Sequence, residues 1–320
     1  MGNKLRVAMI GAGNHSTSVH YPSLHRLDDV ELCAVSELSE ERMCKVRDQY
    51  RIPSGYTDYV QMIEKEAPDA VYLVMPPQAL FPHALKCLEL GANLFVEKPP
   101  GLNVEQARHL ARKAEARNCI TMCGFQRRYA PLVAPALEEA RRRGGVDMIV
   151  SSFYKFYDDP SGYFGGEVDI LTSDCIHAVD LLRYAGGEIQ TMASDVRERH
   201  KPYPNFFTTL IRFKTGATGI LQGNWQAGMR VFSCEIHARG MTDYINVEVE
   251  SRRYTDGNPE VRITTATEAA GSEAIFMRGG FFAQNKLFMD SIRAKRQPPN
   301  NLTDAVQTME LVERIYRETL

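Results

Sequence analysis

Hydrophobic residues in the first 125 positions alternate between short continuous runs and longer stretches with helical spacing. The runs are rich in Val, Ile, Leu, Phe and Met, which is typical of parallel strands buried on both faces of a sheet. We predict five such strands, at residues 4–10, 31–36, 70–75, 93–97 and 120–124.

The stretches between these runs predict helices, of which residues 104–117 are the clearest example. One apolar stripe follows the helical period there and consists of Ala107, Leu110, Ala111 and Ala114. Asn103 and Gln106 have the spacing of a capping box at the start of this helix. Strands that alternate with helices predict βαβ units with right-handed crossovers in one parallel sheet.

After Phe125 the pattern changes to alternation of apolar and polar positions, interrupted by glycine and polar turn residues. This alternation is typical of a mainly antiparallel sheet with one exposed face. We predict strands at residues 151–157, 191–199, 207–213, 219–225, 233–238, 243–249 and 262–267.

Three helices accompany this second group of strands. One is predicted at residues 174–184 and ends at Gly186-Gly187. The other two, at residues 281–294 and 303–318, are separated by Pro298-Pro299, and we predict Thr303 as the N-cap of the last. The sequence therefore predicts an α/β Rossmann domain over residues 1–124 and an α+β domain with a large, mainly antiparallel open sheet over residues 125–320. The last helices of the second domain can pack back on the first.

Length and composition narrow the function classes. A chain of 320 residues exceeds the usual size of one domain, so we expect two domains. Lys plus Arg number 38 against 40 Asp plus Glu, so no broad positive field favours nucleic acid or an anionic membrane as partner. No apolar run has the length of a membrane span or signal peptide. The seven cysteines are scattered, which favours reduced thiols and a cytoplasmic location.

A glycine-rich motif, Gly11-Ala12-Gly13-Asn14-His15-Ser16, follows the first predicted strand and precedes a helical stretch. Gly11 permits a tight turn, and Gly13 lets the backbone approach a pyrophosphate. The helix N-terminus behind them offers free N–H groups to the anion. Ser16 replaces the third glycine and is still small. We therefore predict a dinucleotide site formed by Gly11, Gly13, Asn14 and His15.

Glu37 ends the second predicted strand, where a carboxylate can accept hydrogen bonds from the adenosine ribose. The same charge repels the extra phosphate of NADP, and the neighbours Ser36, Leu38 and Ser39 include no arginine. We predict NAD as cofactor in preference to NADP. The competing interpretation of Glu37 is a surface glutamate that opens a helix.

Lys98 is a candidate for the chemical step. It lies in Glu97-Lys98-Pro99-Pro100, at the end of a strand and so at the sheet edge where doubly wound folds bind their ligands. Pro99 favours an extended backbone at Lys98, which aims the ammonium out of the sheet. A solvated lysine beside a glutamate is the alternative.

His177 is the second candidate. Ser173, Asp174, Asp180 and Leu181 share a helix face with it through three- and four-residue spacing. A histidine flanked by carboxylates can be held in one tautomer and tuned for proton transfer. A partly buried histidine satisfied by its neighbours is the alternative.

Taken together, the glycine motif, Glu97-Lys98-Pro99 and the His-x-x-Asp-Leu-Leu that begins at His177 make this chain resemble the glucose–fructose oxidoreductase/inositol dehydrogenase/MocA (Gfo/Idh/MocA) family. The likeness covers nearly the whole chain. It also includes Met75-Pro76-Pro77 with His83 downstream, residues 91–99, and the Gly-Phe-Gln-Arg-Arg-Tyr segment at residues 124–129.

The resemblance implies a Rossmann domain and an open sheet that is often used to form a homodimer or homotetramer. It implies oxidation or reduction of a carbinol of a sugar, inositol or related polyol by a nicotinamide. By this likeness Lys98 steadies charge on the reacting hydroxyl and His177 is the general acid/base. Pro76, Glu97 and Lys98 join the cofactor-binding residues. The family usually has Asp four residues before this histidine, whereas this chain has Ser173 there and Asp174 one step later, so Asp174 is a third catalytic candidate.

Further polar and aromatic residues are candidates for substrate contact, with ordinary packing as the alternative for each. They are Gln126, Arg127, Tyr154, Tyr157, Asp174 and Trp225. We predict no metal site, because His20 and His25 share no face with a carboxylate cluster.

The sequence thus predicts an NAD(P)-dependent dehydrogenase acting on a small-molecule sugar or polyol. Two alternatives remain open. One is a glycosidase or lyase that oxidises its substrate transiently with bound NAD, and the other is a non-enzymatic nucleotide sensor.

Overall fold

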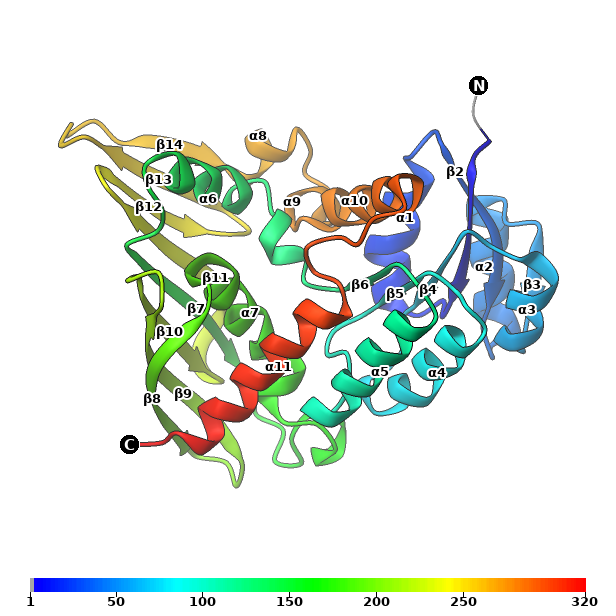
Figure 1. The fold of residues 1–320 in the computed structure, drawn as a ribbon, viewed down its shortest axis with the longest axis horizontal. Coiled ribbons are helices and arrows are strands. Elements are labelled where there is room, and N and C mark those ends of the chain that lie inside the picture. The colour runs from blue at the N-terminus through cyan, green and yellow to red at the C-terminus, as the bar shows by residue number, and fades with distance from the viewer. Residues whose placement is uncertain (1–2) are drawn as a thin grey trace. The chain divides into compact units, whose positions relative to one another are not determined.

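The computed structural model describes residues 3–320 (Figure 1). The chain divides into two compact units. The first, the N-terminal unit, comprises the chain up to Phe125 together with Phe281–Gln307. The second, the sheet unit, comprises Gln126–Gly280 and Thr308–Leu320.

The N-terminal unit contains a six-stranded parallel sheet with the order β3-β2-β1-β4-β5-β6. Its strands are β1 (Leu5–Ile10), β2 (Val30–Ser36), β3 (Ser54–Tyr56), β4 (Ala70–Leu73), β5 (Leu94–Val96) and β6 (Thr121–Cys123). The order reverses between β1 and β4, and in such sheets ligands bind beyond the carboxyl ends of the strands at this point.

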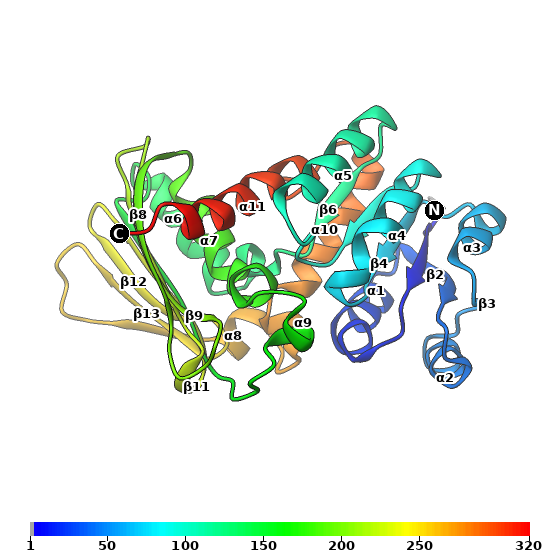
Figure 2. The same ribbon diagram turned by 90° about the horizontal axis from the view of Figure 1, so that it is seen from below.

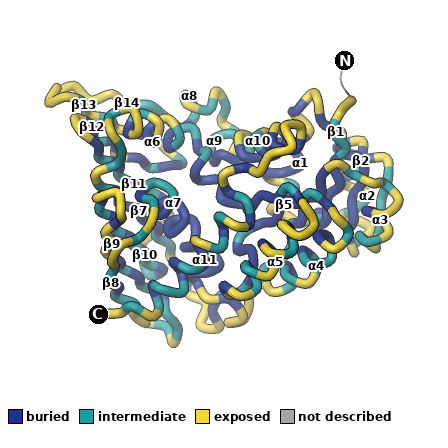
Figure 3. Tube along the Cα trace, viewed as in Figure 1, coloured by how far each residue is buried: buried dark blue, intermediate teal, exposed yellow. Residues whose placement is uncertain are grey.

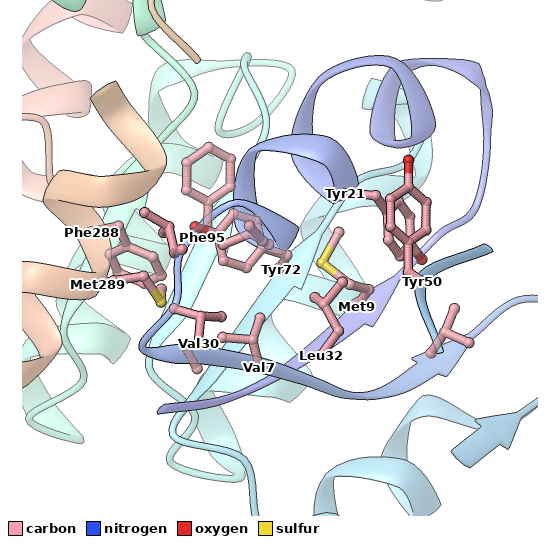
Figure 4. Close-up of a cluster of buried hydrophobic side chains, with 14 of the residues drawn as sticks. Val7, Met9, Tyr21, Val30, Leu32, Tyr50, Tyr72, Phe95, Phe288 and Met289 are labelled. Atoms are coloured by element: carbon pink, nitrogen blue, oxygen red, sulfur yellow. The ribbon is translucent and has the colours of Figure 1, made fainter. Parts of the chain in front are cut away.

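Helices connect these strands, and a helix from the end of the chain joins them. They are the π-helical turn η1 (Ser16–His20), α1 (Tyr21–His25), α2 (Glu40–Tyr50), α3 (Tyr59–Glu66), α4 (Pro77–Glu89), α5 (Val104–Ala116) and α10 (Phe281–Ala294). Figure 4 shows Phe288 of α10 beside Tyr72 and Phe95 in the core. The rings of Tyr72 and Phe95 stack at 4.6 Å, and Phe288 meets the ring of Phe95 at 5.9 Å. Helix α10 therefore completes the core of this unit.

The sheet unit contains eight strands in the order β14-β13-β12-β11-β7-β10-β9-β8. They are β7 (Met148–Phe156), β8 (Ile189–Glu198), β9 (Pro204–Phe213), β10 (Thr218–Asn224), β11 (Gln226–Ala238), β12 (Met241–Asn246), β13 (Glu250–Thr255) and β14 (Arg262–Thr265). Neighbours are antiparallel except for β7 and β10. The predicted fold class, a Rossmann domain plus a mainly antiparallel open sheet, is confirmed.

Helices α6 (Val133–Arg142) and α7 (Ile176–Gly186) pack on one face of this sheet (Figure 2). Helix α7 is buried along nearly its whole length (Figure 3). The remaining short elements are η2 (Gln126–Tyr129), η3 (Tyr163–Gly166), η4 (Leu171–Cys175), α8 (Ala266–Ala270) and α9 (Ile275–Arg278). The last helix of the chain is α11 (Leu302–Arg317).

Several local predictions need correction. Strands β3 and β13 were not predicted, because both are short and contain few apolar residues. Thr303 is not the N-cap of α11, since the helix already begins at Leu302 and the side chain of Asn301 accepts a hydrogen bond from the Asp304 N–H at 3.1 Å. The predicted helix over residues 174–184 is a π-helical turn, η4, followed by α7.

The cap at Asn103 is confirmed, since its side chain accepts a hydrogen bond from the Gln106 N–H at 3.0 Å. The Gln106 side chain accepts from the Leu102 N–H, so the reciprocal bond of the capping box is displaced by one residue. Among residues 3–320, none of the helices is both long and apolar enough to cross a membrane.

Candidate active site

The turn after β1 holds two glycines with different physical roles. Gly11 has φ +105°, and a Cβ there would lie 2.1 Å from the carbonyl oxygen of Val74. Only glycine therefore fits this position. A Cβ at Gly13 would meet no heavy atom within 4 Å, so the turn leaves open space on that side. The fold requires Gly11, whereas Gly13 leaves room for a ligand to approach the backbone.

Glu37 lies beneath this turn and is only 9% exposed. Its carboxylate accepts hydrogen bonds from the Ala12 N–H at 2.8 Å and the Ser39 N–H at 3.0 Å. Arg42 donates a third bond at 2.6 Å. Burial opposes ionisation of Glu37, but these hydrogen bonds outweigh it and lower the pKa of the carboxyl. Glu37 is thus buried rather than a surface residue, and it is Ser39 that caps α2.

Arg42 adds a positive charge beside Glu37, whereas the prediction of NAD assumed that no arginine lies near this carboxylate. The nearest sequence neighbours of Glu37 include no arginine, yet the first turn of α2 brings the Arg42 guanidinium to the carboxylate. The Arg42 side chain is 56% exposed, so its charge is also accessible to a ligand.

Glu97, at the end of β5, is the second buried carboxylate of this unit, with 5% exposure. It accepts hydrogen bonds from His20 Nε2 at 2.8 Å and the Lys98 N–H at 3.1 Å, and His15 Nε2 lies 3.3 Å away. Burial disfavours its charge, but the two histidines hold the pKa of Glu97 well below its usual range. A Cβ at Gly124 would lie 2.7 Å from the carboxylate, so glycine is needed there.

His20 contradicts the expectation that it meets no carboxylate. Its ring is fully buried, with Nε2 on Glu97 and Nδ1 3.3 Å from the Asn285 side-chain oxygen. Together with His15, these groups place three potential metal-ligand atoms within 4.8 Å of one another. The 2.8 Å separation between His20 and Glu97 is a hydrogen-bond distance, so the geometry favours a shared proton over a metal ion.

The other predicted cofactor residues lie at the same edge of the sheet. Asn14 is exposed in the turn after β1, and exposed Pro76 immediately precedes α4 after β4. Lys98 follows β5 and is half-buried, with a cis peptide bond to Pro99. The structure therefore gathers all eight predicted cofactor residues at the carboxyl ends of β1, β2, β4 and β5.

In the sheet unit, His177 lies in the first turn of α7 and is 6% exposed. Asp180, one turn later, accepts hydrogen bonds from the buried Arg128 and from Thr308 Oγ1 at 2.8 Å. Asp180 therefore anchors α7 to η2 through a buried ion pair and to α11 through a hydrogen bond.

Asp174 belongs to a different network. Lys155 of β7 donates to its carboxylate, and the Tyr163 hydroxyl donates to it at 3.1 Å. Tyr163 in turn accepts a hydrogen bond from Trp225 Nε1 at 2.6 Å. Burial and the nearby Asp174 raise the pKa of Tyr163, which keeps this hydroxyl protonated as a donor. Ser173, where the resemblance inferred from the sequence implies Asp, is buried.

The remaining substrate candidates form separate hydrogen bonds and do not share one network. Arg127 donates to Glu248 at 2.6 Å, and Gln126 beside it is buried. Tyr154 donates to the Gln222 side chain at 2.6 Å, and Tyr157 donates to a backbone carbonyl.

Sequence reasoning missed several charged or polar residues around these networks. Four of them are Lys155, Tyr163, Arg230 and Glu248. A usable signal existed for Lys155, because residues two apart on a strand share a face and Phe153 is an evident core residue. The others become neighbours only through the sheet topology.

Comparison with known proteins agrees with this arrangement. A family model described as "Oxidoreductase family, NAD-binding Rossmann fold" (GFO_IDH_MocA) matches residues 5–125. Residues 5–125 of this chain therefore form the NAD-binding domain of the Gfo/Idh/MocA family. The chain is thus an oxidoreductase of an NAD-binding family, and the resemblance inferred from the sequence is confirmed.

Gfo/Idh/MocA relatives extend the match beyond the first domain. Myo-inositol 2-dehydrogenase of Thermotoga maritima is 25% identical over 233 residues, which cover 70% of this chain and 69% of the relative. The scyllo-inositol 2-dehydrogenase (NAD+) of Bacillus subtilis is 25% identical over 237 residues, or 70% and 68% of the two chains. Both relatives are named as dehydrogenases.

Solved structures show the same fold over the whole chain. A dehydrogenase from Chromobacterium violaceum matches with a TM-score of 0.88 and 20% identity, covering 99% of this chain and 95% of the other. Levoglucosan dehydrogenase in complex with NADH and levoglucosan matches with a TM-score of 0.85 and 17% identity, covering 99% and 97%.

Proposed function

We propose that this protein is an NAD-dependent dehydrogenase that transfers a hydride between a nicotinamide and a secondary alcohol or ketone of a sugar, inositol or related polyol. The observation that carries the proposal is the convergence of the glycine turn, Glu37 and Lys98 at one edge of the parallel sheet. This is the edge at which doubly wound folds bind dinucleotides.

The residues present fit a dinucleotide. Open space beside Gly13 admits a pyrophosphate to the backbone, and Gly11 permits the tight turn that passes the Val74 carbonyl. Glu37 is held as a carboxylate where ribose hydroxyls are recognised. When bound, the nicotinamide supplies the hydride acceptor, and the protein handles the proton and the charge on oxygen.

Lys98 and His177 are the residues we propose for that task. The Lys98 ammonium would stabilise negative charge on the reacting oxygen, and His177 would exchange its proton. Asp174 is proposed to support this step by holding Lys155 and Tyr163, the two side chains that donate to it.

NAD is the proposed cofactor in preference to NADP. The buried Glu37 carboxylate would repel a ribose phosphate, and the bond from Arg42 Nη2 to Glu37 commits part of that guanidinium to the carboxylate rather than to a phosphate. Named relatives include both an NAD-dependent inositol dehydrogenase and an NADP-dependent D-xylose dehydrogenase, so the residues of this chain must decide.

We propose that the open sheet forms a homodimer or homotetramer. Strand register places Leu210 of β9, Tyr244 of β12 and Ile263 of β14 along one line across the sheet, on the same face. All three side chains are exposed, as is Tyr254 on the same face. Exposed apolar residues gathered on one face favour association. Sedimentation at micromolar concentration tests this, and a monomeric mass contradicts it.

A cytoplasmic location is also proposed. The seven cysteines are free thiols and all but Cys44 are buried, which suits a reducing compartment.

The experiment that tests the function is absorbance at the reduced-nicotinamide band with NAD or NADP and a panel of sugars and cyclitols. A substrate-dependent rise with NAD, much weaker with NADP, is expected. Tight NAD binding without net reduction would instead favour transient internal oxidation by a glycosidase or lyase. Binding without any conversion of substrate would favour a nucleotide sensor.

A further inference from the structure

Three positively charged side chains of the sheet unit surround a pair of phenylalanine rings. Lys155 Nζ and Arg230 Cζ lie 5.2 and 5.4 Å from the ring centre of Phe153. Arg127 Cζ lies 4.9 Å from the ring centre of Phe232, and the two rings are 5.1 Å apart. We call Arg127, Lys155 and Arg230 the Phe153 cation cluster. Neither proton transfer nor cofactor binding, as proposed above, requires three cations here.

The cluster carries more positive than negative charge. Glu248 accepts hydrogen bonds from both Arg127 and Arg230, and Asp174 accepts one from Lys155. Three cations thus contact two carboxylates, which leaves one positive charge in excess. Arg127 is buried, whereas Lys155 and Arg230 are partly exposed, so an anion can reach this excess positive charge from solvent.

Arg127 shows where hydrogen-bond acceptors are lacking. It is 5% exposed, and its Nε and Nη1 atoms have no hydrogen-bond partner among residues 3–320. Burial lowers the pKa of this guanidinium, and the neighbouring Glu248 only partly offsets the effect. Buried donors of a charged group are expected to be satisfied in the functional state. Anionic oxygens are the acceptors that suit a guanidinium best.

Strand β11 is irregular beside this cluster. Its register with β7 shifts between Gln226 and Val231, and Arg230 lies in the shifted segment. Bulges of this kind redirect side chains and are frequent next to binding sites. Here the irregularity places the Arg230 guanidinium over the ring of Phe153, with 41% of the side chain still exposed.

The cluster lies close to the candidate general acid/base within the same unit. Asp174, which holds Lys155, precedes His177 by three residues. Arg128, the neighbour of Arg127, is bonded to Asp180, three residues after His177. An anion bound by the cluster is therefore held near the first turn of α7.

We propose that the Phe153 cation cluster binds a carboxylate group of the substrate, so that the substrate is a sugar acid or polyol acid rather than a neutral polyol. The inference rests on the proposed dehydrogenase function and specifies its substrate class. A single carboxylate matches the single excess positive charge, whereas a phosphate monoester carries more negative charge than the cluster can compensate.

Trp225 provides a binding readout that does not depend on turnover. It is the single tryptophan of the chain, its ring contacts Phe153 at 5.2 Å, and its Nε1 donates to Tyr163. Tryptophan fluorescence is measured while the full-length protein with NAD is titrated with gluconate, glucuronate, glucose, myo-inositol or glucose 6-phosphate. Saturable changes are expected with the two carboxylates at concentrations at least tenfold lower than with the neutral compounds.

Arg230→Gln tests the cluster, because Arg230 is partly exposed and its loss leaves the buried Arg127–Glu248 pair in place. We expect about tenfold weaker carboxylate binding, the value of one charged hydrogen bond. Arg252→Gln is the matched control, since Arg252 is an exposed arginine of β13 bonded to Glu250. It should leave binding unchanged.

Steady-state kinetics with NAD then separates the two proposals. A KM for the carboxylate raised about tenfold in Arg230→Gln, with kcat nearly unchanged, supports the inference. Turnover of neutral polyols alone, equal effects of Arg230→Gln and Arg252→Gln, or tighter binding of glucose 6-phosphate than of both carboxylates overturns it. Carboxylate binding that Arg230→Gln weakens, without any turnover, supports the anion site and refutes the dehydrogenase function.

Discussion

The carboxylates of the two proposed binding sites differ in their burial and in their hydrogen-bond donors. In the N-terminal unit, the buried Glu37 and Glu97 accept hydrogen bonds from backbone N–H groups, of Ala12 and Ser39 and of Lys98, in addition to side-chain bonds from Arg42 and His20. In the sheet unit, Glu248 and Asp174 are bonded to the ends of long cationic side chains. Backbone donors are fixed by the fold, whereas lysine and arginine side chains can change partners.

This difference suits the two tasks we propose. A cofactor that is the same in every turnover is best recognised by groups held in place by the backbone. Substrates differ from one family member to another. They are best recognised by side chains, which can be replaced without altering the fold. The Nε and Nη1 atoms of Arg127, which have no hydrogen-bond partner among residues 3–320, suit the recognition of a substrate by side chains.

The largest expected effect concerns the chemical step in the sheet unit. His177→Asn should reduce kcat by roughly 10²–10⁴-fold, because a general acid/base is lost. NAD binding, assigned to the other unit, should change less than twofold. His109→Asn, a substitution at a histidine of α5, is the control. A kcat within a factor of three of the wild-type value would refute the role given to His177.

The two glycines of the first turn test whether the N-terminal unit separates folding from binding. Gly11→Ala forces a Cβ to within 2.1 Å of the Val74 carbonyl and should cost roughly 2 kcal/mol or more of unfolding free energy. Gly13→Ala meets open space in the free protein. Its stability should stay within about 1 kcal/mol, while NAD affinity falls roughly tenfold or more as the methyl group occupies the pyrophosphate's place.

Urea denaturation and NAD titration of both variants measure this pair of effects. Equal losses of stability in Gly11→Ala and Gly13→Ala would show that both glycines serve the fold. Unchanged NAD affinity in Gly13→Ala would contradict the dinucleotide site.

The same contrast explains what could be predicted from sequence. The glycine turn, β1 and the cap at Asn103 are determined by residues a few positions apart, and their patterns were interpretable. The bond between His20 and Glu97 joins residues 77 positions apart, and the bond between Arg127 and Glu248 spans 121. No local periodicity encodes such pairs, so the structure alone revealed the histidine–glutamate cluster and the Phe153 cation cluster.

Local errors had local causes as well. Both Asn301 and Thr303 are residue types that can cap a helix. A long-range contact decides between them, because the Leu302 N–H donates a hydrogen bond to the Thr121 hydroxyl of β6 at the point where α11 begins. Arg42 was overlooked because the first turn of a helix returns it to Glu37 from five positions away.

Cofactor choice should respond to a smaller change. Glu37→Gln removes the charge that repels a ribose phosphate and leaves Arg42 free to attract it. We expect kcat/KM with NADP to rise about tenfold, because relief of the like-charge repulsion, already reduced by Arg42, is worth about 1.4 kcal/mol. The double variant Glu37→Gln/Arg42→Ala should lose most of this gain. No gain with NADP in Glu37→Gln would show that Glu37 does not face the ribose.

The smallest expected effect is on the pH dependence of stability in the N-terminal unit. The histidines hold the pKa of Glu97 below its unfolded value of about 4.3, so its ionised form stabilises the fold above that pH. As pH falls through this value toward the lower folded pKa, the unfolded chain binds the extra proton and the stabilisation is lost. Glu97→Gln cannot release or bind that proton. Its unfolding free energy should therefore decline less steeply than that of the wild type between about pH 5 and 3, in urea titrations at each pH.

Glu235→Gln, at a glutamate that is 42% exposed beside His237, is the control and should keep the wild-type slope. Parallel slopes for Glu97→Gln and the wild type would mean that the carboxylate gains no more from its histidines in the folded state than from water in the unfolded one.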